Sequence, residues 1–158
     1  MTLQPISSAD NAAMAAVIRT VMPEFNCVGE GFSITDPEVD DLAEAYAALG
    51  SDFFVVKDET AVLGGAGFAP LAGGDGTVCE LRKMYVLPAG RGRGAGRLLM
   101  DACLAGAKAA GYTHMYLETV TAMEDAARVY KKYGFTYLDG PMGDTGHGGC
   151  DRWMIRAL

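Results

Sequence analysis

A turn crowded with glycine and arginine is the segment whose residue types and spacing most directly suggest chemistry. It runs from Leu87 to Arg97 as LPAGRGRGAGR, between a strand-like run and an amphipathic helical run. Glycines let the backbone approach a ligand closely and leave consecutive N–H groups unshielded by Cβ atoms. The following helix adds unpaired amides and partial positive charge at its N-terminus. The turn therefore predicts a site for a phosphate or diphosphate group.

Other phosphate-binding motifs fit this turn less well. A P-loop needs Gly-Lys followed by Ser or Thr, which the run Gly96-Arg97-Leu98 does not provide. A dinucleotide fingerprint can be laid over residues 90–95, but it belongs near the first strand of its domain, and here about three strands come first. A merely glycine-rich turn and an RNA-binding Arg-Gly segment are further alternatives. The formal net charge of −7 argues against general nucleic-acid binding.

The elements that must position this turn follow from periodicity and from capping residues. Helices are expected at about residues 8–22, from Asp36 to Gly50, at 94–110 and at 124–133, and residues 23–36 are expected to form a loop. Strands are expected at about residues 53–57, 61–69, 77–87, 114–119, 135–138 and 151–156, and a further short strand at Thr2 to Pro5 is compatible with the pattern. Hairpins followed by strand–helix–strand units predict an α/β fold with a mixed sheet and helices on both faces.

Length and composition limit the class of protein. The 158 residues suit one domain, 1–158, and half of them are apolar, as is ordinary for a soluble globular protein. We expect neither a signal peptide nor a membrane span, and hence a cytoplasmic protein. The four cysteines are scattered and form no C-x-x-C pair, so we expect buried thiols and no metal site; His147 and Cys150 would supply only half of one.

The turn also meets the pattern Arg/Gln-x-x-Gly-x-Gly/Ala, from Arg91 to Gly96. With this match, the segment Glu80–Leu99 resembles the coenzyme-A motif of the GNAT superfamily of acyl-CoA-dependent N-acyltransferases. The segment Ala127–Phe135 is similar to that family's A-x-x-x-Y-x-x-x-G-F motif. The resemblance spans nearly the whole chain and implies a central, mostly antiparallel mixed sheet with a splayed strand pair. It also implies acetyl-CoA as co-substrate.

The resemblance assigns cofactor contacts to two segments. The backbone of the strand around Tyr85 should bond the pantetheine arm. The family's β-bulge should splay the strand there, which the sequence permits because alternation fails around Arg82-Lys83-Met84. The amides after Arg91 should hold the diphosphate, and the side chains of Arg91 and Arg93 should add charge. The implied contact residues are Met84, Tyr85, Val86, Arg91, Gly92, Arg93, Gly94, Ala95, Gly96 and Arg97.

The same resemblance implies the catalytic groups. Tyr130 matches the tyrosine that hydrogen-bonds or protonates the departing thiolate, although packing is the competing interpretation and Tyr133 is an out-of-register neighbour. A base must take the proton of the attacking amine; Glu80 and Glu118 are the candidates, with His147 in a late loop as a third. The chain departs from the family pattern at Met123, where many relatives have asparagine.

These residues predict an N-acetyltransferase in which a primary amine attacks the thioester directly. The Val86 amide would polarise the carbonyl, and no acyl-cysteine intermediate is expected because Cys79 and Cys103 have no histidine beside them. A non-catalytic CoA or acyl-CoA sensor is the alternative. The negative net charge favours a cationic acceptor, a small molecule or a peptide, without identifying it. No nucleic-acid or membrane partner is expected, and a homodimer remains an option.

Overall fold

The computed structural model describes all 158 residues and contains one seven-stranded sheet. The strands lie in the order β1-β2-β3-β4-β5-β7-β6, and only β4 and β5 are parallel. Their bounds are β1 Thr2–Pro5, β2 Asp52–Lys57, β3 Val62–Pro70, β4 Val78–Val86, β5 His114–Thr119, β6 Thr136–Leu138 and β7 Arg152–Ala157. The expected mixed, mostly antiparallel sheet is confirmed, including the short first strand.

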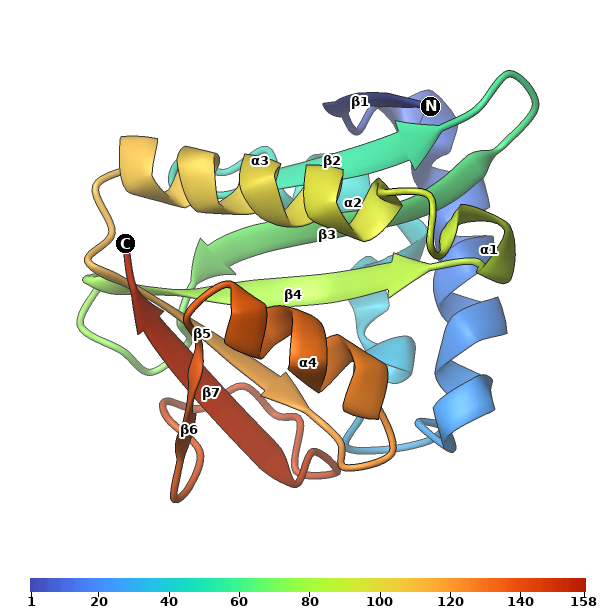
Figure 1. The fold of residues 1–158 in the computed structure, drawn as a ribbon. Helices are drawn as coiled ribbons and strands as arrows, with labels where there is room; N and C mark the ends of the chain where they lie inside the picture. The colour runs from blue at the N-terminus through green and yellow to red at the C-terminus, as the bar shows by residue number, and fades with distance from the viewer.

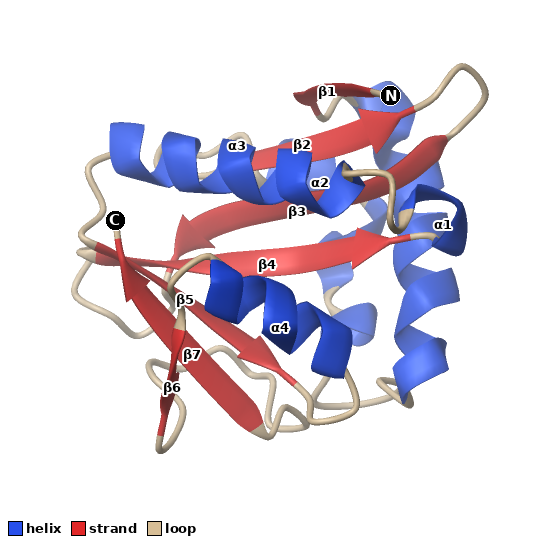
Figure 2. Cartoon of the chain, viewed as in Figure 1, coloured by secondary structure: helices blue, strands red, loops and turns tan.

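Helices cover both faces of the sheet (Figures 1 and 2). The helices are α1 Asn11–Val21, α2 Leu42–Ala45, α3 Ala95–Ala109 and α4 Glu124–Lys132. A core around Leu99 and Met154 lies under α3 and α4, and a second core around Ile18 and Val55 lies under α1 and α2. The two cores form because strand side chains alternate between the faces, so each helix layer receives its own set of apolar residues.

One expected element is wrong. In place of a helix from Asp36 to Gly50, the chain forms a 3-10 turn at Pro37–Asp40 and then the short α2. Asp36 makes no capping bond, because its carboxylate is bonded to side chains of other segments. Asp41 lies at φ −143° and ψ 53°, outside the helical region, and so separates the two turns.

The parallel pair β4–β5 opens along its length. Register pairs run only from Val78–His114 to Glu80–Tyr116, although β4 continues to Val86. Figure 1 shows the two strands starting side by side and then diverging. The expected splayed pair is thus confirmed, and it leaves a cleft in the middle of the sheet.

A β-bulge in β4 accompanies the divergence. Gly65 pairs with Tyr85 and Gly67 pairs with Arg82, so one residue of β3 faces two residues of β4. Lys83 within this bulge has φ +53°, a conformation that side chains with a Cβ seldom adopt. The extra residue bends β4 away from β5, as the family resemblance implied and the failed alternation in the sequence permitted.

Candidate active site

The cleft between β4 and β5 contains a pocket whose inner cavity is about 50 Å³. Eight of its 15 lining residues are apolar, and the polar ones include Glu80, Glu118 and His147. The structure therefore brings together all three candidates for the base, which come from β4, β5 and the loop before β7. A wider, polar depression of about 410 Å³ adjoins it and shares Arg82 and His147 with it.

The glycine-arginine turn lies at the other end of β4, where the strand leads into α3. No backbone amide from residue 92 to residue 97 donates a hydrogen bond to another atom of the protein. Gly92 and Gly94 have φ +71° and +91°, and a Cβ added at either would meet no atom within 4 Å. Consecutive amides at a helix N-terminus, in open space, form a concavity suited to an anion such as a diphosphate.

Two of the three arginine side chains of the turn already make hydrogen bonds within the protein. Arg91 makes an ion pair with Glu24, at 2.9 and 3.2 Å, and donates from Nε to the carbonyl oxygen of Val86 at 2.9 Å. Arg93 donates to the carbonyl oxygen of Ala89 at 3.0 Å, while Arg97 makes no hydrogen bond or ion pair. Glu24 therefore holds the Arg91 side chain in place, although no local pattern in the sequence indicates this partner.

The strand residues proposed to bind pantetheine line the divergent half of β4. The Leu87 amide bonds the Leu63 carbonyl of β3 at 2.8 Å. Successive amides of a strand point in opposite directions, so the Val86 amide points away from β3, toward the side on which β5 has diverged. The Tyr85 phenol lies 3.2 Å from the Ser33 hydroxyl and forms part of the pocket wall, and Met84 packs against the core under α3.

Glu80 is the more buried of the two candidate carboxylates, at 2 % exposure. Burial raises its pKa, and the Arg82 guanidinium, which donates to it at 2.8 Å, lowers the pKa in part. Glu118 lies on β5, two residues beyond the register partner of Glu80. It accepts hydrogen bonds from Tyr116 at 2.8 Å and from Thr145 at 2.9 Å. A buried carboxylate of raised pKa is suited to proton abstraction near neutral pH.

Tyr130 lies on α4, packed edge-on against Phe135 with ring centroids 6.0 Å apart. Burial raises its pKa to about 12. Its phenol oxygen makes no hydrogen bond within the protein, although the residue as a whole is buried at 7 % exposure. By contrast, the Tyr133 hydroxyl donates to Asp101 at 2.8 Å. Of the two tyrosines, only Tyr130 has a free hydroxyl.

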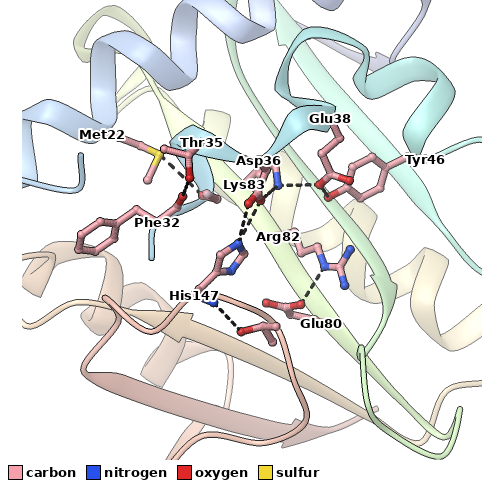
Figure 3. Close-up of polar contacts among 12 residues, drawn as sticks. Met22, Phe32, Thr35, Asp36, Glu38, Tyr46, Glu80, Arg82, Lys83 and His147 are labelled. Carbon is pink, nitrogen blue, oxygen red and sulfur yellow. Dashed lines mark hydrogen bonds and ion pairs between the residues drawn. The ribbon is translucent and has the colours of Figure 1, made fainter. Parts of the chain in front are cut away.

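The sequence did not indicate a cluster of charged side chains beside the pocket (Figure 3). The Lys83 ammonium lies 2.7 Å from Asp36 and 2.6 Å from Glu38, and Asp36 also contacts the imidazole of His147. Local patterns indicate Asp36 only as the start of a helix and Lys83 only as an interruption of the strand pattern. No local rule relates residues so far apart in the chain.

The cysteines are poor nucleophiles in this structure. Burial raises the pKa of Cys79 and of Cys150 to about 12 and also raises that of Cys103. A thiol needs a lowered pKa to act as a nucleophile, so even Cys150, which lines the pocket, is unsuited to carrying an acyl group. No group of three or more His, Cys, Asp or Glu side chains is placed to hold a metal ion. No helix combines the length and apolarity needed to cross a bilayer.

Comparison with known proteins identifies the family to which this architecture belongs. Residues 15–135 match the model of the acetyltransferase (GNAT) family. The chain is 38% identical over 157 residues to the uncharacterized N-acetyltransferase YjgM of Escherichia coli, covering 99% of this chain and 94% of that protein.

Solved structures share the fold. A GNAT-family acetyltransferase from Staphylococcus aureus aligns with a TM-score of 0.82 at 20% identity, over 99% of this chain and 98% of that one. A Salmonella typhimurium protein, yncA, described as a putative acetyltransferase with its cofactor acetyl-CoA, aligns with a TM-score of 0.78 at 23% identity, over 100% and 94%. The fold and these matches define an N-acetyltransferase. The chain belongs to the GNAT family of acetyltransferases.

Proposed function

We propose that the protein transfers an acetyl group from acetyl-CoA to a primary amine, carried by a small molecule or a peptide, by direct attack. The free amides of residues 92–97 carry this proposal, because they offer a diphosphate the donors that the fold leaves unpaired. The Salmonella protein of the same fold was solved with acetyl-CoA, which supports the choice of acyl donor. The splayed strands give the pantetheine arm a path from the turn to the pocket.

Different residues of the site carry out the separate proton transfers. Glu80 takes a proton from the amine, whose nitrogen attacks the thioester carbonyl carbon while the Val86 amide donates to the carbonyl oxygen. The new C–N bond forms as the C–S bond breaks, and the phenol of Tyr130 protonates the departing thiolate. The second proton that the acetylated nitrogen loses then restores the phenol. Glu118 is the second candidate for the base, and its hydrogen bonds to Tyr116 and Thr145 fix its position.

The acceptor is expected to be cationic before it loses its proton. Four carboxylates line the site: those of Glu80 and Glu118 in the pocket and those of Asp36 and Glu38 in the adjoining depression. They face the cations Arg82 and Lys83, and His147 when protonated, so the site has an excess of negative charge. Structures of the same fold include an aminoglycoside 6'-acetyltransferase and a ribosomal-protein-alanine N-acetyltransferase, so this fold admits both small and protein amines.

Two measurements test the proposal. Titration calorimetry should show acetyl-CoA binding to the purified protein, and an amine panel should release free CoA, detected by chromatography. Tyr130→Phe and Tyr133→Phe are matched variants. Each loses one phenolic hydroxyl and keeps its ring, Tyr130 within α4 and Tyr133 at the C-terminal end of α4. We expect only Tyr130→Phe to reduce turnover while binding is kept. Absence of acetyl-CoA binding by the wild-type protein would overturn the proposal.

A further inference from the structure

The ammonium of Lys83 is almost completely withdrawn from solvent, at 1% side-chain exposure. It lies between the carboxylates of Asp36 and Glu38, at 2.7 and 2.6 Å. A buried cation is tolerated only where opposite charges and hydrogen bonds replace its water, and two carboxylates supply both. Because Lys83 is in the bulge at φ +53°, this cluster attaches the Pro37–Asp40 turn directly to the strained part of β4.

Asp36 also connects this cluster to a third segment of the chain. Its two carboxylate oxygens lie 3.1 and 3.0 Å from Nε2 of His147 (Figure 3). Burial alone would raise the pKa of Asp36, but His147 and Lys83 together lower it. The pKa of His147 is raised chiefly by its hydrogen bond to Asp36. One carboxylate therefore joins β4 to the loop that contains His147.

That loop, residues 139–151, borders the two depressions through Thr145, His147 and Cys150, and we call it the strap. It contains five glycines, so few side chains are available to pack it in place. Polar contacts hold it instead: the Asp144 amide donates to the Ala72 carbonyl at 2.7 Å, and the Gly149 amide donates to the Gly31 carbonyl at 3.0 Å. Thr145 donates to Glu118 at 2.9 Å, and His147 contacts Asp36.

His147 is the residue through which the strap reaches both depressions. It lines the inner pocket with Glu80 and Glu118 and also the outer depression with Asp36 and Arg82. The Lys83 ammonium, by contrast, is enclosed by carboxylates, so it is not available to a ligand. No hydrogen bond or ion pair connects this cluster to the turn formed by residues 92–97.

We infer that Lys83 and Asp36 are positioning residues for the acceptor amine: the ammonium fixes the carboxylate, the carboxylate fixes the imidazole of His147, and the imidazole holds the strap as the wall of the acceptor site. This inference rests on the proposed function, since it takes the pocket beside Glu80 as the amine site. The positioning role affects the binding of the two substrates differently. Disturbing the cluster should weaken the acceptor's binding more than the binding of acetyl-CoA.

The variant Asp36→Asn tests this with little change of shape. Its matched control is Asp40→Asn, in the adjacent 3-10 turn, where Asp40 makes an exposed ion pair with Arg19 at 2.7 Å. With the best acceptor from the amine panel, Asp36→Asn should raise the acceptor KM by about tenfold to a hundredfold, because losing a hydrogen bond to a charged group weakens the interaction by a factor of that order. The Kd for acetyl-CoA should remain within about twofold for both variants, because no hydrogen bond or ion pair joins Asp36 or Asp40 to the turn formed by residues 92–97.

A spectroscopic readout needs no acceptor. The chain has two histidines, and His114 is exposed, so its imidazole serves as an internal reference. The groups facing His147 are Asp36 from the 3-10 segment and Glu80 and Lys83 from β4. In Asp36→Asn the pKa of His147 measured by NMR should fall toward its ordinary value, the amide of Gly149 should exchange faster, and His114 should not change.

Lys83→Met supplies an independent test, because it removes the charge and keeps most of the buried stem. It should raise the acceptor KM by a larger factor than it raises the acetyl-CoA Kd, because Lys83 lies directly before the strand residues assigned to the pantetheine arm. An unchanged acceptor KM and His147 pKa in Asp36→Asn would refute the positioning role while wild-type turnover still upheld the proposed function. Equal effects on both substrates, or the same effect in Asp40→Asn, would also refute it. If the wild-type protein failed to bind acetyl-CoA, the proposed function itself would be wrong.

Discussion

Two glycines at opposite ends of α3 allow the role of the glycine-arginine turn to be separated from its backbone conformation. Gly94 precedes the helix and Gly111 follows it; both have φ +91°, and a Cβ added at either would meet no atom within 4 Å. An alanine at each position therefore carries the same left-handed strain and no steric clash. Only Gly94 lies among the amides proposed to bind the diphosphate.

The expected stability loss is the same for Gly94→Ala and Gly111→Ala. Left-handed backbone costs a residue with a Cβ about 1–2 kcal/mol, and each kcal/mol lowers the Tm of a chain of this size by about 2–4 °C. Binding should differ. Displacing one amide from a charged phosphate oxygen loses about 1.5–3 kcal/mol, which is roughly a tenfold to hundredfold increase in Kd.

Thermal unfolding without ligand and calorimetric titration with acetyl-CoA measure the two effects separately. We expect similar Tm losses for both variants and an increased acetyl-CoA Kd for Gly94→Ala alone. Wild-type affinity in Gly94→Ala would show that the turn does not hold the diphosphate. Equal loss of affinity in Gly111→Ala would show that the strain, and not the contact, is responsible.

Three further predictions concern single side chains. Tyr130→Phe should lower kcat by on the order of 10²-fold in steady-state assays without lowering Tm, because its hydroxyl has no partner to lose; unchanged kcat would contradict the acid role. Burial raises the pKa of Glu80, so wild-type kcat/KM should fall as the pH falls through that raised pKa. Glu80→Gln should flatten this acid limb of the pH–rate profile. If the limb persists in the variant, another residue is the base. Burial alone would raise the pKa of Asp10, but hydrogen bonds to Lys57 and Ser7 lower it below 3.8. The stability that this carboxylate adds is therefore present above its unfolded pKa and is lost as the pH falls through the folded pKa. Urea unfolding of Asp10→Asn should lack that acid-dependent loss; equal acid sensitivity in both proteins would argue against it.

Local sequence patterns predicted most of the elements, because periodicity and capping act over neighbouring residues. The helix α3 occupies Ala95–Ala109 where 94–110 was expected, and β5 occupies His114–Thr119 as expected. The helix expected from Asp36 was wrong for a long-range reason. A proline after an aspartate is a sound local signal for a helix start, but here the carboxylate is bonded to residues 47 and 111 positions away.

The sequence by itself determined the glycine-rich turn before α3 and the helical segment that carries Tyr130, since both depend on residues adjacent in the chain. It permitted the bulge at Lys83, which the family resemblance implied. Only the tertiary structure brought Glu80 and Glu118 into one pocket, attached Arg91 to Glu24, and enclosed the ammonium of Lys83 between Asp36 and Glu38. Those contacts join segments that are distant in sequence. Their partners are chosen by packing and by the need to neutralise buried charge, which no local pattern encodes.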